Sequence, residues 1–175
     1  LEKSQWKLQQ DLPSDIDWYI EFSNICRGIK GMIEEQIETL DEPVSSKDFN
    51  ATIQVLIVSP NGMLVGHIGD GRMGFQDNDG IWHSLIIPHK GEEANSTVFL
   101  MNRWDKPRIP AAKMSGVHIP ETRVVNSIPA KVVLMTDGCE NFSWKCVAYN
   151  EEKGQYIDRN EPFESFLNPL FEKLD

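Results

Sequence analysis

The stretch from Ala51 to Phe75 constrains the fold most, because it holds two apolar runs joined by a turn. The runs are Ile53 to Val58 and Met63 to Ile68, with Ser59-Pro60-Asn61-Gly62 between them. β-Branched residues dominate the first run, and Pro followed by Asn-Gly is typical of turns. The pattern predicts a β-hairpin whose second strand runs directly into Gly69-Asp70-Gly71.

A second segment, Lys131 to Asn141, repeats this arrangement. Its apolar run, Val132 to Met135, predicts a buried strand that ends at Thr136-Asp137-Gly138. A carboxylate beside a glycine at a strand end can be approached from outside, so two such ends suggest a metal or phosphate site. Asp-Gly is also a common turn pair. The residues alone leave two interpretations open: two turns, or one site that uses Asp70 and Asp137.

Length, charge and cysteine usage narrow the class of protein. The 175 residues are enough for a single domain, residues 1–175, with a sizeable core. The net charge of −10 argues against a nucleic-acid partner and against an anionic membrane surface. No run reaches the ~18 apolar residues of a membrane span. Cys26, Cys139 and Cys146 lack zinc-site spacing, which favours reduced thiols in a cytoplasmic protein.

Two helical patterns flank the expected strands. Ser14 is expected to cap a helix that ends near Leu40. Glu161-Pro162 is expected to open a final helix that contains Pro169. We expect the first helix to face the core through a stripe at helical spacing, which consists of Ile16, Tyr19, Ile20, Ser23, Cys26, Ile29, Ile33 and Ile37.

The remaining segments predict further strands and loops. A second hairpin is expected, with strands at residues 72–75 and 81–87 and a turn at Asp77-Asn78-Asp79-Gly80. The turn resembles a calcium loop but lacks the later glutamate, so we interpret it as a solvated turn. Residues 97–101 predict a short strand, and residues 150–160 predict a surface loop.

The histidines are interpreted as structural or as surface residues. His67 lies in an apolar strand and is interpreted as a packed side chain and not as a catalytic base. His83 and His89 are too scattered in the sequence to predict a zinc site.

Taken in order, the motifs resemble those of the metal-dependent protein phosphatases of the protein phosphatase 2C type, most closely their small bacterial branch. The matching features extend the resemblance over roughly residues 16–174. They are Ala51-Thr52 at a strand start, the Ser59-Pro60-Asn61-Gly62 turn, Gly69-Asp70-Gly71, the stretch Gly91-Glu92-Glu93-Ala94-Asn95 with Thr97 and Phe99, and Thr136-Asp137-Gly138.

The resemblance implies a fold, an activity and a set of metal ligands. The implied fold is an α/β (α+β) sandwich of two mainly antiparallel β-sheets flanked by helices. The implied activity is hydrolysis of phosphoserine and phosphothreonine esters in proteins by a water that two Mn²⁺ or Mg²⁺ ions activate. Asp137, with the adjacent Gly138, matches a direct metal position, and Asp70 matches the position of a weaker additional metal. Asn141 stands where the family often has a further Asp, which weakens the case for a third metal.

The resemblance also implies metal carboxylates outside this sequence. The family's first Asp-Gly is expected upstream of Leu1, and its last metal-binding Asp is expected after Asp175. On this expectation the chain is either an internal part of a longer protein, which we favour, or a partial domain that cannot catalyse alone, and by itself it is expected to turn over little or no substrate. Three functions stay open: an active metal-dependent serine/threonine phosphatase, a pseudophosphatase or regulatory binding module with the same fold, and a β-rich interaction domain whose Asp-Gly pairs are turns.

Overall fold

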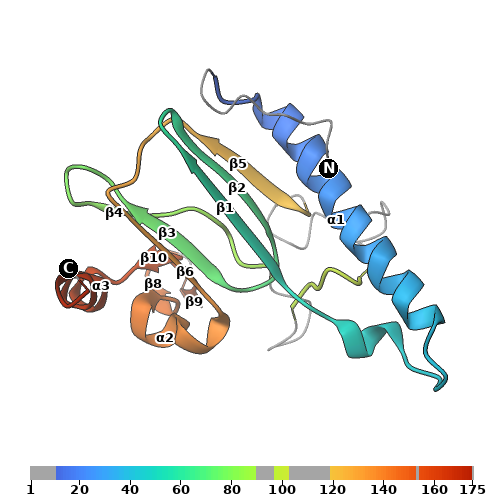
Figure 1. The fold of residues 1–175 in the computed structure, drawn as a ribbon. Coiled ribbons are helices and arrows are strands. Elements are labelled where there is room, and N and C mark those ends of the chain that lie inside the picture. The colour runs from blue at the N-terminus through green and yellow to red at the C-terminus, as the bar shows by residue number, and fades with distance from the viewer. Residues whose placement is uncertain (1–10, 90–96, 103–118, 153, 175) are drawn as a thin grey trace. The chain divides into compact units, whose positions relative to one another are not determined.

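The structure is a computed structural model that describes residues 11–89, 97–102, 119–152 and 154–174. These residues form helices and antiparallel sheets (Figure 1). The predicted α/β (α+β) class with antiparallel sheets is therefore confirmed. The chain divides into two compact units. Unit 1 comprises Leu1–Asp70 and His89–Ile128, and unit 2 comprises Gly71–Pro88 and Pro129–Asp175.

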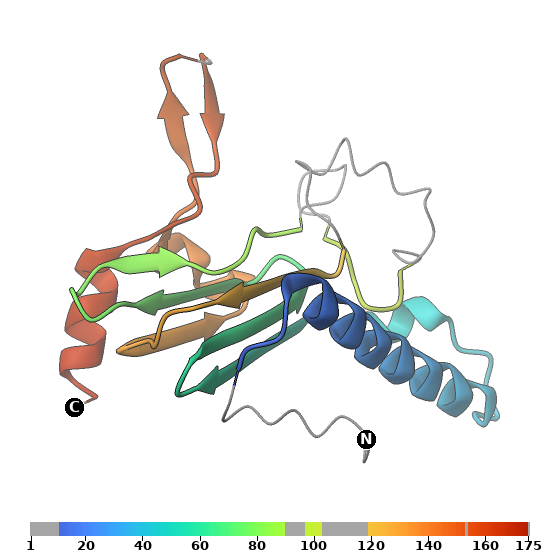
Figure 2. The ribbon, with the colours of Figure 1, turned by 90° about the horizontal axis from the view of Figure 1, so that it is seen from above.

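Unit 1 consists of one long helix and a three-stranded sheet. Its elements are α1 (Asp15–Glu38), the 3-10 helix η1 (Ser46–Phe49), β1 (Ile53–Ser59), β2 (Gly62–Ile68) and β5 (Glu121–Val125). The strands are ordered β1-β2-β5, and each neighbouring pair is antiparallel. The predicted hairpin is confirmed, with Ser59 paired with Gly62 across the turn. Figure 2 shows the same elements from above.

The core of unit 1 lies between α1 and β2. Trp18 donates a 2.6 Å hydrogen bond from Nε1 to the Val65 carbonyl oxygen. Phe22 lies against Gly66, where a Cβ atom would come within 2.6 Å of the ring. Burying a side chain such as Phe22 stabilises the fold by roughly 1.5–3 kcal/mol. The buried cluster consists of Trp18, Phe22, Cys26, Leu64, Ile68, Val98 and Leu100.

The first helix was predicted correctly in extent and in part in its buried face, because Ser23 and Cys26 are buried and Ile29 and Ile33 pack against the core as expected. Ser14 caps it as expected, because its side chain accepts from the Asp17 N–H. Ile16 and Ile20 are exposed, at 62% and 51% of their surface, so their place in the predicted stripe was wrong. The buried face instead centres on Trp18 and Phe22 because the large aromatic rings fill the space above Gly66.

Unit 2 contains a second three-stranded sheet and several short elements. Its main sheet has the order β4-β3-β6, and β7 pairs with β10 and β8 with β9. The elements are β3 (Arg72–Gln76), β4 (Trp82–Ser84), β6 (Lys131–Met135), the 3-10 helix η2 (Asp137–Cys139), α2 (Glu140–Ser143), β7 (Trp144–Lys145), β8 (Ala148–Asn150), β9 (Gln155–Ile157), β10 (Glu161–Pro162) and α3 (Glu164–Glu172).

The core of unit 2 is built on two tryptophans. Trp82, Trp144, Cys146 and Leu167 form the buried cluster. The ring of Trp144 lies close over Gly74, where a Cβ atom would be 3.1 Å from it. The indole N–H of Trp82 donates a 2.8 Å bond to a side chain of α3. The sheet and α3 therefore pack through aromatic rings.

Several local predictions need correction. The return strand is shorter than residues 81–87, since β4 ends at Ser84. Residues 97–101 form no strand beyond a single bridge at Thr97, and the Leu100 N–H donates to the Ala51 carbonyl oxygen, which lies just before β1. The expected loop at 150–160 contains the β8–β9 hairpin, in which the rings of Tyr149 and Tyr156 are in contact.

The start of the last helix also differs from the prediction. Glu161-Pro162 forms strand β10 against β7, and α3 begins only at Glu164. Pro169 lies inside α3 as expected. Residues 91–96 of the stretch that resembles the phosphatases lie outside the described residues. None of the described helices combines the length and the apolar character that crossing a bilayer requires.

Candidate metal centre

Asp70 stands where β2 leaves the sheet of unit 1. The preceding Gly69 has φ +130°, a conformation that side chains rarely adopt. A Cβ atom at Gly69 would also lie 2.4 Å from Cγ2 of Thr52. The glycine before Asp70 is therefore required by the backbone path itself.

Two buried histidines hold the Gly69 peptide in place. Nε2 of His67 donates to the Gly69 carbonyl oxygen at 2.7 Å, and the backbone N–H of His89 donates to the same oxygen at 2.7 Å. The Gly69 N–H donates to Nδ1 of His89 at 3.2 Å. Burial, reinforced by His67, lowers the pKa of His89 to about 3, so this ring is neutral and can accept. The backbone that carries Asp70 is thus anchored, while no described residue bonds to the Asp70 carboxylate.

Asp137 has a different setting in unit 2. It follows β6, begins η2 and is exposed to solvent. Its carbonyl oxygen accepts from the Glu140 N–H, which closes the 3-10 turn. A Cβ atom at Gly138 would meet only Oγ1 of Thr136, at an ordinary 3.9 Å. No described residue engages the Asp137 carboxylate, and nothing in the described part of unit 2 crowds Gly138.

A buried arginine supports the segment that follows Asp137. Arg72, at the start of β3, is fully buried and donates to Glu140 at 2.9 Å, to Asp158 at 2.6 Å and to Asn160 at 2.8 Å. Burial lowers the pKa of Arg72, but the bonds to Asp158 and Glu140 more than offset this and hold it above its ordinary value. Because Glu140 opens α2 directly after η2, Arg72 ties β3 to the Asp137 segment within unit 2.

Comparison with known proteins decides the family. A family model described as protein phosphatase 2C matches residues 4–175. The chain belongs to the protein phosphatase 2C family. The resemblance drawn from the Asp-Gly motifs is thereby confirmed at the level of the family. No curated protein and no solved structure matches the chain.

Members of the protein phosphatase 2C family are metal-dependent and act on phosphoproteins, so the predicted metal residues can be tested for fit. Asp70 belongs to unit 1, whereas Asp137 and Gly138 belong to unit 2, and their convergence stays a prediction. The oxygen atoms that Asp70, Asp137 and Gly138 offer fit Mn²⁺ or Mg²⁺. Mn²⁺ and Mg²⁺ prefer carboxylate and carbonyl oxygens, and no described residue occupies either carboxylate.

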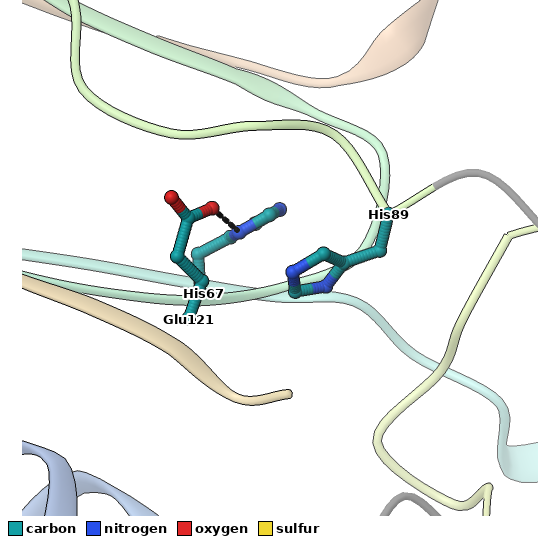
Figure 3. A group of neighbouring side chains, drawn as sticks. All are labelled: His67, His89 and Glu121. Atoms are coloured by element: carbon teal, nitrogen blue, oxygen red, sulfur yellow. Dashed lines mark ion pairs between the residues drawn. The ribbon is translucent and has the colours of Figure 1, made fainter. Parts of the chain in front are cut away.

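One group in this member of the protein phosphatase 2C family was missed by the sequence interpretation. The spacing of His83 and His89 predicts no zinc site, yet the fold brings His67, His89 and Glu121 together in unit 1 as a group that could hold a metal ion (Figure 3). His67 is packed, as predicted, with 0% of its surface exposed. His83 instead lies near the surface and bonds to Asp77 in the predicted turn. The β2–β5 register places His67 opposite Glu121, and the bond from the His89 N–H to the Gly69 carbonyl brings His89 beside them.

Proposed function

We propose that this protein hydrolyses phosphoserine and phosphothreonine esters of proteins in a reaction that depends on Mn²⁺ or Mg²⁺. The family match over residues 4–175 supports phosphatase chemistry in general. The observation that carries the specific proposal is the Asp137 carboxylate, which lies exposed at a strand end with no described residue bonded to it. A carboxylate that contributes nothing to its own unit's hydrogen bonding is available to a cation.

Asp137 and the adjacent Gly138, together with Asp70, would hold the metal ions. When bound, the ions supply a water of lowered pKa and neutralise charge on the phosphoryl oxygens. The chain's own residues prepare these positions. Arg72 fixes the segment after Asp137 through Glu140, and the buried peptide of Gly69 fixes the backbone that leads to Asp70. The net charge of −10 makes bound cations useful for accepting an anionic phosphoester.

The proposed surroundings follow from the same residues. Cys26 and Cys139 form no disulfide, which supports a reducing compartment, and we therefore propose a cytoplasmic protein. The partner would be a phosphorylated protein and not a nucleic acid, because the acidic chain offers no basic footprint for a phosphate backbone.

The test is metal-dependent phosphate release from a phosphothreonine peptide by the full-length natural protein. Asp137→Asn should lower the rate by more than about 100-fold, since losing an outer-shell partner of a metal already costs 10–100-fold. Its thermal midpoint should stay unchanged because the side chain is exposed. Asp79→Asn is the matched control, since Asp79 is an exposed aspartate of the surface turn, and it should keep the full rate.

A pseudophosphatase or regulatory binding module with the same fold is the second candidate. It is favoured by Asn141, an exposed residue of α2 that stands where the family often has an aspartate. A full-length protein that folds, binds no Mn²⁺ and releases no phosphate would support this second function and contradict the first. Equal rates for the wild type and Asp137→Asn would contradict the assignment of Asp137.

A further inference from the structure

A buried group of three potential metal ligands lies in unit 1, whereas Asp137 belongs to unit 2. His67 comes from β2, Glu121 comes from β5, and His89 comes from the segment after β4 (Figure 3). The antiparallel register places His67 and Glu121 directly opposite each other, so their side chains share a face of the sheet. His89 joins them because its backbone bonds to Gly69, just beyond β2.

The spacing of the three side chains suits one small cation. One ligand atom from each lies within 4.8 Å of the others. Nδ1 of His67 is 3.3 Å from Oε2 of Glu121. Two ligands at zinc distances of about 2.0–2.2 Å in a tetrahedral site are roughly 3.4 Å apart, so this edge already has the required length. For an ion to bind, only the distances from the His89 ligand atom to the other two ligand atoms would have to shorten. The His89 ring already packs against His67, with centroids 4.2 Å apart.

The hydrogen bonds leave two ring nitrogens pointing into this gap. Because Nε2 of His67 donates to the Gly69 carbonyl, a neutral His67 has its lone pair on Nδ1, facing a carboxylate oxygen. Two acceptors that face each other need a cation or a proton between them. Nδ1 of His67 and Nε2 of His89 are both buried without a hydrogen-bond partner in the part of the chain that is described. Figure 3 shows one nitrogen of His89 directed toward the other two side chains.

We propose that His67 Nδ1, His89 Nε2 and the Glu121 carboxylate bind a divalent ion of the zinc type. Imidazole nitrogens with one carboxylate suit Zn²⁺ better than Mg²⁺, which prefers oxygen ligands. This site shares no residue with the proposed site at Asp70 and Asp137, and it does not depend on phosphatase activity. Its role is structural, because the ion would join β2, β5 and the segment after β4.

The surroundings of the group match those of protein metal sites. Metal-binding histidines usually donate their second ring N–H to a carbonyl or a carboxylate, as His67 does to Gly69. Glu121 is also held, because Arg123 donates to its Oε1 at 2.9 Å. Ion binding would move the ring proton of His89 to Nδ1 and would give up the 3.2 Å bond from the Gly69 N–H. That bond is the longest of the three that hold the Gly69 peptide.

The experiment measures cobalt and zinc uptake by the full-length natural protein. The protein is treated with a chelator, dialysed and titrated with Co²⁺ in the presence of excess Mg²⁺, which occupies oxygen-rich sites. The wild type should bind one Co²⁺ with the visible absorption of a four-coordinate site. His89→Ala should bind it at least 10-fold more weakly, and His83→Ala, which changes a surface histidine, should bind it as the wild type does.

Two further measurements keep the outcome clear. If His89→Ala fails to fold, X-ray absorption on the zinc-loaded wild type should show two imidazole ligands. Asp137→Asn should leave cobalt binding unchanged even where it abolishes phosphate release, which separates this site from the phosphatase centre. Absence of tight Co²⁺ binding by the wild type, equal binding by His89→Ala, absence of imidazole ligands, or loss of binding in Asp137→Asn would each overturn the proposal. A proton shared between His67 Nδ1 and Glu121 Oε2 would then explain why these two acceptor atoms face each other.

Discussion

The two strand-end aspartates differ in what their neighbouring glycines do. Gly69, before Asp70, has φ +130° and no room for a Cβ atom beside Thr52. Gly138, after Asp137, has ordinary space around it in unit 2. Folding therefore requires a glycine at position 69, whereas the fold of unit 2 would also accept a residue with a side chain at position 138. A glycine that folding does not require is the better indication of a site that something must approach.

The two positions are also held by different kinds of interaction. Hydrogen bonds from and to the rings of His67 and His89, and the backbone N–H of His89, hold the Gly69 peptide in unit 1. In unit 2 the segment after Asp137 is held by a fully buried guanidinium and the carboxylates of Glu140 and Asp158. Removing one member of a buried ion network leaves the remaining charges unpaired, which costs more than losing one neutral hydrogen bond. The comparison therefore predicts that removing one member of the buried ion network in unit 2 lowers the free energy of unfolding more than removing one hydrogen bond at Gly69.

The largest expected effect comes from Arg72→Met, which keeps the volume but removes the charge. The carboxylates of Glu140 and Asp158 are 18% and 25% exposed, so water compensates in part. We expect a loss of about 3 kcal/mol in the free energy of unfolding, at the lower end of what breaking a buried pair costs. Chemical denaturation of both proteins measures the difference.

Arg159→Ala provides the matched control for this prediction. Arg159 forms a surface ion pair with Glu161 at 3.5 Å and is more than half exposed. Surface pairs contribute about 0–1 kcal/mol, so the control should unfold almost as the wild type does. Equal stability of Arg72→Met and Arg159→Ala would show that the buried network does not support unit 2.

The predicted parts of the fold are those in which local sequence and tertiary structure agree. The β1–β2 hairpin could be predicted because β-branched residues flank a Pro and Asn-Gly turn. The start of α1 could be predicted from Ser14, whose side chain caps it. The part of the buried face that Trp18 and Phe22 form could not, because Ile16 and Trp18 fit helical periodicity equally well. Gly66, far along the chain, decides the face by making room for Phe22.

The candidate site divides in the same way. Asp70 and Asp137 could be proposed as metal residues because each forms a local motif with glycine after an apolar run, and their role stays a prediction. His67, His89 and Glu121 could not, because they are distant in sequence and each looks ordinary in its own segment. Strand register and the bonds to Gly69 bring them together, and neither can be predicted from the sequence of a single segment.

The two glycines allow a direct test of the comparison. Gly69→Ala forces a side chain into φ +130° against Thr52, and we expect it to lower the free energy of unfolding by about 1–3 kcal/mol. Gly138→Ala should change stability by less than about 1 kcal/mol, with a gain possible because alanine restricts the unfolded chain. Thermal and chemical unfolding measure both. If Gly138→Ala destabilised the protein as much as Gly69→Ala, the distinction between the two glycines would be wrong.

Activity adds a second measurement to the same pair of variants. If the carbonyl or the open space of Gly138 serves a metal, Gly138→Ala should lower Mn²⁺-dependent phosphate release while the protein remains fully folded. The main expected effect of Gly69→Ala is instead a lower free energy of unfolding. A Gly138→Ala protein that keeps both its stability and its full rate would remove Gly138 from the proposed metal residues.

The smallest effect concerns the thiols, which report how open the Asp137 segment is. Cys139 ends η2, two residues after Asp137, and is exposed. Cys26 is buried in the core of unit 1, and burial raises its pKa to about 12. Cys146 is buried in unit 2 and accepts a bond from Arg72. Thiol reactivity follows exposure and thiolate content, so an aromatic disulfide reagent should label one thiol rapidly in the native protein.

Cys139→Ser should abolish this rapid phase, while Cys26 should react only at the rate of global unfolding. Bound Mn²⁺ should slow labelling of Cys139 and leave that of Cys26 unchanged, because the metal would occupy the space beside Asp137. Counting labelled thiols by mass spectrometry at short times measures each phase. Rapid labelling of Cys26 would contradict the packed core between α1 and β2. A labelling rate at Cys139 that ignores Mn²⁺ would indicate that Asp137, although exposed, is not where the metal binds.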